Sequence, residues 1–354
     1  MVINIDELCE TVKFNCDIAD ARHAGDYTLC TYLMKMRELY RWEQGYAFDV
    51  ELKNEDVGQW VRDREEYWEA IEAQAYASLP IAGDCHDPFE QASVNQYLLP
   101  EGFVYSSGLG QKSAAHFFLA KLDERRTQEG FEILIAGKEF ARDLASPPAM
   151  TRGDTIFIRR ESLRRWLWER VQEWQWNRCE GALGRALASY PIDDNIERTL
   201  DDLVEDQLQM VLLHEIGEHS AGQGLESDWQ ALLMAVSGTR AELELRAVRD
   251  NLADAKSTLP ALLQQPRPEL LHFYFAVLSP LRRKLYPALM VAYESWCQSG
   301  STDLLEESVV RGESHWAKVM QAALLIYQQE QKGCASGIVA MVDHQTRVFS
   351  EFFQ

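Results

Sequence analysis

The residues of this sequence best suited to chemistry gather in one short stretch, residues 211–222, which reads Val-Leu-Leu-His-Glu-Ile-Gly-Glu-His-Ser-Ala-Gly. Four residues within it are of types that bind metal ions, namely His214, Glu215, Glu218 and His219. An apolar run precedes them, and polar groups placed beside a hydrophobic core cost free energy unless a partner satisfies them. The stretch therefore predicts a site for a divalent cation, which would satisfy these polar groups.

The spacing of the two histidines leaves two arrangements open. His214 and His219 are five residues apart, so at about 100° per residue they diverge by about 140° around a regular α-helix. Both can bind one ion only where the helix widens into a π-type turn, which Gly217 would ease. Alternatively, the ion uses a pair at i and i+4, because such a pair shares one helix face. The available pairs are His214 with Glu218 and Glu215 with His219.

The same stretch resembles the zinc motif of the dipeptidyl-peptidase III family. In that family a His-Glu-x-x-Gly-His helix supplies two zinc ligands and a general-base Glu, and a later helix with a Glu-Glu-x-Arg-Ala type motif supplies the third ligand. Here Glu218 stands where the family has Gly. Downstream, the run Glu244-Leu-Arg-Ala resembles the second motif, with Leu243 in place of its first Glu and Glu242 one residue earlier.

The resemblance implies a set of ligands and a base. The zinc ligands would be His214, His219 and Glu244, and Glu215 would be the general base. Glu218 is a further candidate ligand, because it lies four residues after His214. The likeness is confined to residues 211–247 of the 354, and no family is recognised in the rest of the chain.

This set of residues is chemically sufficient for hydrolysis. Three protein ligands leave a fourth position on zinc for water, and the metal lowers the pKa of that water toward about 7. Glu215 would accept the proton, and Arg246 or Arg249 on the later helix would steady a developing oxyanion. We therefore expect a zinc-dependent hydrolase of peptide or amide bonds, acting on a small-molecule or peptide substrate.

Two other functions are compatible with the same residues. In a non-catalytic metal-binding or scaffold protein, the helix would hold an ion for stability alone. In a metal-free interaction module, the histidines and glutamates would form a solvated face or pair with nearby arginines. The arginines available for such pairs are Arg240, Arg246 and Arg249.

A second group of polar residues lies near the N-terminus. Asp17, Asp20, His23 and Asp26 recur at every third position. A helical turn would bring Asp20 and His23 together. These residues would either join the metal site, line a pocket, or serve as caps and local turns before the next helix.

Composition bears on partners and compartment. The formal net charge of −21 disfavours nucleic-acid binding and contact with acidic membrane surfaces. The seven cysteines are odd in number and include no Cys-x-x-Cys, so a secreted disulfide framework is not expected. With neither a signal-peptide pattern nor an apolar run of about 18 residues, we expect a cytoplasmic protein. The oligomeric state is not indicated.

The elements that must position these residues follow from periodicity and turn signals. Strands are expected at 102–105, 131–136 and 155–158, and helices in the first half at 26–43, 54–78, 111–126 and 161–178. From about residue 195 onward only helices are expected, at 196–221, 226–236, 239–256, 268–298, 302–331 and 335–353. Pro280 and Pro287 should interrupt the fourth of these.

The predicted fold class is α+β and predominantly α-helical. A small sheet should lie in the middle of the N-terminal half, and the C-terminal half should be all helical. The expected domains are residues 1–190, a mixed α/β domain, and residues 191–354, a helical domain that carries the candidate metal site.

Overall fold

A computed structural model describes residues 3–110, 114–178, 180–192, 195–265 and 267–351. The chain divides into two compact units. Unit 1 comprises the residues up to 172 together with 191–208, and unit 2 comprises 173–190 together with the residues from 209 onward. The expected domains meet between residues 190 and 191. The observed units differ from them in two segments, since residues 173–190 belong to unit 2 and residues 191–208 belong to unit 1.

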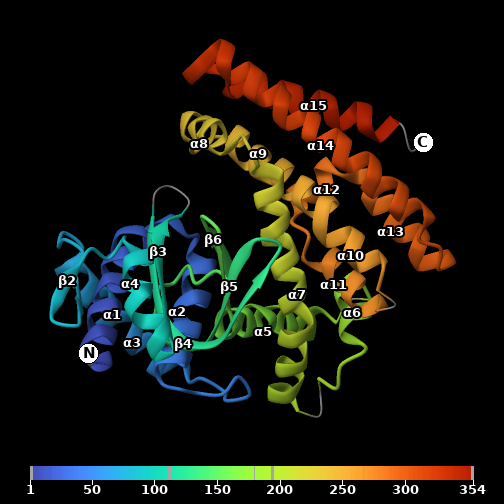
Figure 1. The fold of residues 1–354 in the computed structure, drawn as a ribbon. Coiled ribbons are helices and arrows are strands. Elements are labelled where there is room, and N and C mark those ends of the chain that lie inside the picture. Colours follow the sequence, from blue (N-terminus) through green and yellow to red (C-terminus); the bar gives the residue numbers. More distant parts are fainter. Residues whose placement is uncertain (1–2, 111–113, 179, 193–194, 266, 352–354) are drawn as a thin grey trace. The chain divides into compact units, whose positions relative to one another are not determined.

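Unit 1 is built on a five-stranded sheet with strand order β3-β4-β5-β7-β6 (Figure 1). Neighbouring strands are antiparallel except for β5 and β7, which are parallel. A separate two-stranded ribbon is formed by β1 (Leu79–Ile81) and β2 (Asp84–His86). The strands of the sheet are β3 (Phe103–Leu109), β4 (Ala115–Gln128), β5 (Phe131–Arg142), β6 (Ala149–Arg152) and β7 (Thr155–Arg159).

Strand β5 is much longer than its parallel neighbour. β7 pairs only with residues 132–136 of β5, and the pairing of β4 with β5 is interrupted by bulges between Leu119 and Glu124. On the β7 side, the second half of β5 therefore relies on other partners. One is the carboxylate of Glu161, which accepts a hydrogen bond from the backbone N–H of Glu139 at 3.0 Å.

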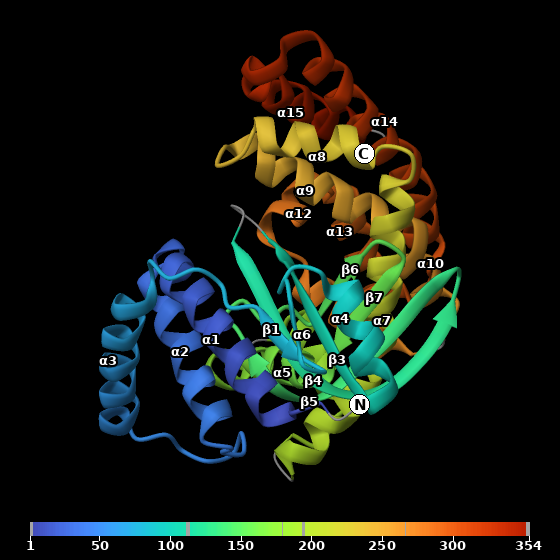
Figure 2. The same ribbon diagram turned by 60° about the vertical axis from the view of Figure 1, so that its left-hand side comes forward.

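Helices of the N-terminal segment cover this sheet. α1 (Ile5–His23) packs against β4, where Leu8, Val12 and Cys16 share a buried cluster with Phe117 and Leu119. α2 (Leu29–Glu43) and α3 (Asn54–Ile71) lie beside α1 (Figure 2). The remaining helices that lie wholly or partly in unit 1 are α4 (Gln91–Leu98), α5 (Arg160–Asn177) and α7 (Ile196–Gly222).

The helix expected at residues 111–126 was wrong. Residues 111–113 lie outside the described part of the chain, and residues 115–126 belong to β4. This strand is rich in Ala, Leu, Lys, Glu and Arg, which favour helices in isolation. Pairing with β3 on one side and β5 on the other overrides that preference, as β-propensity depends mainly on neighbours and burial.

Among its described residues, unit 2 is entirely helical. This confirms the predicted fold class, including the small sheet in the N-terminal half and the helical C-terminal half. Pro280 and Pro287 begin new helices, as expected from the interruption of the 268–298 pattern. Besides the end of α7, the main helices are α6 (Ala182–Leu187), α8 (Glu226–Ala235), α9 (Arg240–Ala253), α10 (Leu259–Leu263), α11 (Pro268–Val277), α12 (Pro280–Leu285), α13 (Pro287–Ser299), α14 (Asp303–Glu330) and α15 (Ala335–Glu351). Within the described chain, no helix has both the length and the apolar character needed to cross a membrane.

A π turn and a glycine shape the part of unit 2 that carries the candidate site. The π turn, Asp254–Thr258, directly follows α9. α7 stays α-helical through residues 214–219, so the widening considered for α7 occurs in its neighbour instead. Gly217 has a different role from the one expected, since a Cβ there would lie 2.4 Å from the carbonyl oxygen of Ala253. The bare glycine lets α7 approach the start of the π turn closely.

Replacing this glycine should therefore destabilise unit 2. We expect Gly217→Ala to lower the free energy of unfolding by about 1–3 kcal/mol through overpacking. Urea unfolding followed by circular dichroism measures the change. Gly333→Ala is the matched control in the same unit, because a Cβ at that position meets nothing within 4 Å. Equal stability of the two variants would contradict the close approach.

Candidate functional site

Three side chains of unit 2 converge as ion ligands could. His214 and Glu218 lie one turn apart on α7, and Asp250 lies near the end of α9. One nitrogen of His214 and one carboxylate oxygen of each acid all lie within 4.8 Å of one another. Within the described residues, this is the one group of three or more such side chains that could hold a metal ion.

His214 is held from its far side by a buried carboxylate. Its Nδ1 lies 2.7 Å from Oδ1 of Asp254, the first residue of the π turn, whose side chain is 2% exposed. Its Nε2 lies 3.4 Å from Oε1 of Glu218. With Nδ1–H donated to Asp254, the lone pair of neutral His214 is on Nε2, on the side of Glu218. A carboxylate behind a histidine in this way fixes the orientation of metal-binding imidazoles.

Arg282 anchors this carboxylate in turn. The guanidinium of Arg282, on α12, forms a short ion pair with Oδ2 of Asp254. It also donates to Oδ1 of Asn251 at 2.9 Å and to the backbone carbonyl of Asp250 at 3.3 Å. The side chain that orients His214 is therefore fixed by α12 as well as by the π turn.

The charges of the group are coupled. Burial alone would lower the pKa of His214, but the carboxylates of Asp254 and Glu218 outweigh it and raise that pKa well above its ordinary value. Burial opposes ionisation of Asp254, yet Arg282 and His214 hold its pKa below the ordinary range. For Asp250, burial prevails and raises the pKa. Without an ion, the two carboxylates therefore favour the protonated, imidazolium form of His214.

Arg249 lies beside the second carboxylate oxygen of Glu218. Its Nη2 donates to the backbone carbonyl of Glu218 at 3.2 Å and lies 3.7 Å from Oε2 of the same residue. Arg246, the other arginine considered for this role, instead pairs with Glu242 at 2.9 Å. Of the two, Arg249 is therefore the one that could act beside the group.

The structure brings together only part of the expected ligand set. His214 and Glu218 meet, which is one of the two i, i+4 pairs expected. His219 and Glu215 are partly buried on α7 and do not belong to the converging group. Glu244 is buried, and it accepts a hydrogen bond from Arg240 at 2.7 Å.

Asp250 takes the place expected for Glu244. The two residues are six positions apart on α9, or about 9 Å along the axis, so Glu244 lies nearer the opposite end of that helix. Asp250 and Asp254 were not anticipated, although a signal was present. They are four residues apart in the segment expected to be helical, and such a pair shares one face.

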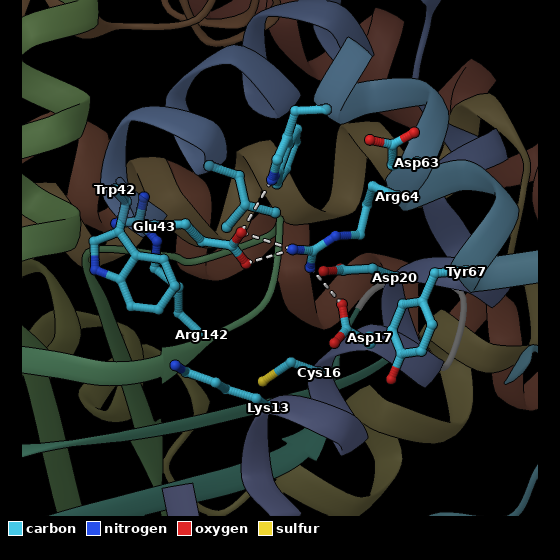
Figure 3. A pocket seen from close by; sticks show the side chains of 12 residues that line it. Lys13, Cys16, Asp17, Asp20, Trp42, Glu43, Asp63, Arg64, Tyr67 and Arg142 are labelled. Carbon is cyan, nitrogen blue, oxygen red and sulfur yellow. Dashed lines mark hydrogen bonds and ion pairs between the residues drawn. The ribbon is translucent and has the colours of Figure 1, made fainter. Parts of the chain in front are cut away.

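Two of the N-terminal polar residues, Asp17 and Asp20, line a different place, a cavity of about 350 Å³ in unit 1 (Figure 3). Arg64 lies between two acids there, with 2.6 Å from Nη2 to Oε2 of Glu43 and 2.8 Å from Nη1 to Oδ1 of Asp17 (Figure 3). Asp20 accepts a hydrogen bond from the backbone N–H of Leu144 at 2.9 Å.

His23 is not a lining residue of this cavity, and its Nδ1 lies 3.4 Å from Oδ2 of Asp26. The pocket interpretation therefore holds for Asp17 and Asp20.

Cys16 also lines this cavity but is not a reactive thiol. Burial raises its pKa well above the ordinary value, and its Sγ donates to the carbonyl of Phe117 at 3.3 Å. Since the thiolate is the nucleophilic form, nucleophilic catalysis by Cys16 is disfavoured.

The chain belongs to a family described as a family of unknown function (DUF6866). Residues 7–159 match the N-terminal domain of that family, and residues 164–345 match its C-terminal domain. The candidate metal group lies within the second match, and the cavity of Figure 3 lies within the first. Searches of the curated proteins and of the solved structures found no match.

The coupling of His214 to Asp254 predicts a pH dependence in the metal-free protein. We expect His214 to keep its proton well above pH 6.5, the ordinary value. In the Asp254→Asn variant the pKa of His214 should fall toward 6.5 or below it. Glu218 would then be the one remaining carboxylate that counteracts the effect of burial on this pKa. Titration of the histidine Cε1–H resonances by NMR, with His214 assigned from a His214→Gln spectrum, measures both values.

The same shift has a consequence for stability. Because the folded pKa of His214 lies above the unfolded one, the pair stabilises the fold fully below about pH 6.5, and this contribution is lost as pH rises through the folded pKa. Asp343→Asn, which removes an acid that pairs with Arg240, is the control and should leave the titration unchanged. Identical titration of His214 in wild type and Asp254→Asn would contradict the coupling.

Proposed function

We propose that this chain binds a divalent cation, zinc in the first place, through His214, Glu218 and Asp250, and hydrolyses a peptide or amide bond with water bound to that ion. The observation that carries the proposal is the convergence of one imidazole nitrogen and two carboxylate oxygens within 4.8 Å. The second support is the buried Asp254 behind His214, at 2.7 Å.

The donor set suits such an ion. Zinc accepts nitrogen and oxygen ligands, and three protein ligands leave a position for water. The two carboxylates together balance the charge of a divalent cation. The side chains of His214 and Glu218 are 28% and 31% exposed, so water and a substrate group can reach them.

The proposed catalytic roles agree only in part with those implied by the resemblance to the dipeptidyl-peptidase III zinc helix. Glu215, which follows the first ligand in both, is the proposed general base. The ligand set departs from that family, because Glu218 and Asp250 replace His219 and Glu244. Arg249 replaces Arg246 as the group that would oppose negative charge developing on the substrate. The substrate class we propose is a small molecule or a peptide.

A metal-free function is the second candidate, and the ion pairs already present favour it. His214 bridges Asp254 and Glu218, and Arg282 binds Asp254, so these contacts alone connect α7, the π turn and α12. In that case the cluster fastens the helices of an interaction module. Metal content separates the two candidates.

The acidic composition and the cysteine usage inform the setting of this function. A net charge of −21 repels nucleic acids and acidic membrane surfaces, so neither is proposed as a partner. The odd number of cysteines supports the cytoplasm as the proposed compartment.

The two ligand sets predict different outcomes for metal binding. We expect stoichiometric zinc in the purified protein by plasma mass spectrometry, lost in His214→Gln and in Asp250→Asn. Asp254→Asn should weaken zinc binding by about 10–100-fold, because Asp254 orients His214 without touching the ion. His219→Gln is the control and should retain the metal.

Loss of zinc in His219→Gln, with retention in Asp250→Asn, would restore the ligand set expected from the sequence. A protein that takes up no zinc, manganese or other divalent cation on dialysis would leave the metal-free cluster as the function of these residues.

The role of Glu215 is testable separately. On a panel of fluorogenic peptide and amide substrates, we expect Glu215→Gln to keep its metal and to lose turnover by about 10²–10⁴-fold, as for a general base. Loss of metal together with activity would make Glu215 a ligand. Absence of turnover in fully zinc-loaded wild type would make the metal structural.

A further inference from the structure

A second, larger cavity of unit 1 adjoins the one in Figure 3. It has a volume of about 850 Å³ and shares Lys13, Trp42, Glu43 and Arg142 with the smaller cavity (Figure 3). Its lining has an excess of basic groups, with six basic and four acidic side chains. This excess is opposite in sign to the net charge of the chain, which is −21. The basic residues are Lys13, Arg41, Lys138, Arg142, Arg164 and Arg165.

Three of these cations are already engaged by the protein. Arg41 lies 3.1 Å from Oε2 of Glu38. Arg164 and Arg165 each lie 2.7 Å from a glutamate oxygen. The other three, Lys13, Lys138 and Arg142, are differently placed. Lys13 and Lys138 are exposed, and within the described residues neither ammonium pairs with a carboxylate.

Arg142 is a buried cation with spare donors. Its side chain is only 4% exposed, and its Nη1 is 3.8 Å from Oε2 of Glu139, which is beyond hydrogen-bond distance. Its Nη2 donates one long hydrogen bond, 3.3 Å, to the carbonyl of Glu38. A guanidinium has five N–H donors, so this buried charge is incompletely satisfied.

Glu139 satisfies Arg142 only in part. Its Oε1 accepts hydrogen bonds from Arg159 and Ser162, each at 2.8 Å, and its Oε2, the oxygen 3.8 Å from Arg142, forms no hydrogen bond with any described residue. Burial lowers the pKa of Arg142 to about 10, which shows that its surroundings do not fully offset the cost of the buried charge. An anion in the cavity would supply the hydrogen-bond acceptors for Arg142 that Glu139 does not provide.

Two of the cations come from one stretch of β5. Lys138 and Arg142 are four residues apart on this strand, in the half that extends beyond β7, and both line the cavity. Phe140 lies between them on the same strand. Lys13 approaches from α1, and Figure 3 shows Lys13, Trp42 and Arg142 on the same side of the smaller cavity.

Aromatic side chains form a further part of the wall. The lining includes Trp42, Tyr46, Phe48 and Phe140. The guanidinium carbon of Arg142 lies 4.6 Å from the ring centroid of Trp42. Aromatic walls combined with a few charged groups are typical of small-molecule sites.

We propose that this cavity binds a small organic anion, with a phosphate or carboxylate group held by Arg142, Lys13 and Lys138 and a planar apolar group against the aromatic wall. Arg142 supplies the planar, bidentate donor that such anions accept, and the lysines add charge at the rim. The site lies in unit 1 and does not depend on the metal group of unit 2.

Isothermal titration of the full chain with simple probes tests this site. Phenyl phosphate and benzoate carry one anionic group and one ring, and benzyl alcohol lacks the charge. We expect saturable binding of at least one anion and none of benzyl alcohol. The tighter of the two anions identifies phosphate or carboxylate as the natural group. Binding should weaken with added salt.

Variants connect the binding to the named residues. Lys13→Gln combined with Lys138→Gln should weaken anion binding at least about tenfold. The matched control, Lys53→Gln combined with Lys121→Gln, removes the same charge from exposed positions outside both cavities and should bind as wild type. Arg142→Lys keeps the charge but loses the planar fork, and should also weaken binding once circular dichroism shows that it is folded.

Two results would overturn the proposal. One is the lack of saturable binding of either anion by wild type at concentrations up to about 10 mM, an affinity too weak for a built site. The other is equal affinity in the Lys13 and Lys138 double variant and in its matched control, which would place the binding elsewhere on the protein.

Discussion

The ion pair between His214 and Asp254 is the contact on which the rest of the candidate metal group depends. It joins the middle of α7 to the first residue of the π turn, and Arg282 extends it to α12. Because the acid is almost fully buried, its charge would be costly without both partners. The same contact sets which nitrogen of the imidazole is available to a ligand. One interaction therefore serves both the packing of three helical segments and the chemistry proposed for them.

The two units share a way of combining polarity with burial. In each unit, an irregular stretch of backbone lies next to charged side chains. A regular helix or strand would leave these side chains on the surface. In unit 2 the π turn places Asp254 beside α7, and Gly217 permits the approach. In unit 1 the bulged β5 extends beyond its neighbour β7, and on that side its far half meets charged groups rather than another strand. Irregular elements of this kind recur at functional sites.

Much of the fold could be predicted from periodicity, and the reasons for the failures are local. The helices of the C-terminal half followed their apolar spacing, and Pro280 and Pro287 broke them where the ring forbids continuation. β4 was mistaken for a helix because its composition suits one and its partners are distant in sequence. α1 was missed as a helix although Leu8, Val12 and Cys16 recur at helical spacing. In the site, His214 and Glu218 could be paired by helix geometry alone. Asp250 and Asp254 reach them only through the packing of two helices, which Gly217 controls and no local pattern reveals.

The half of β5 that β7 does not pair has one more consequence, for self-association. An open strand edge inside a sheet offers backbone groups to any passing chain, and natural proteins guard such edges with bulges and inward-pointing charges. Here the carboxylate of Glu161 already occupies the amide of Glu139, and Lys138 and Arg142 flank it. A foreign strand would have to displace these charges before it could add to the sheet. The charged side chains that line the cavity along this strand edge thus also prevent the edge from pairing with other chains and starting aggregation.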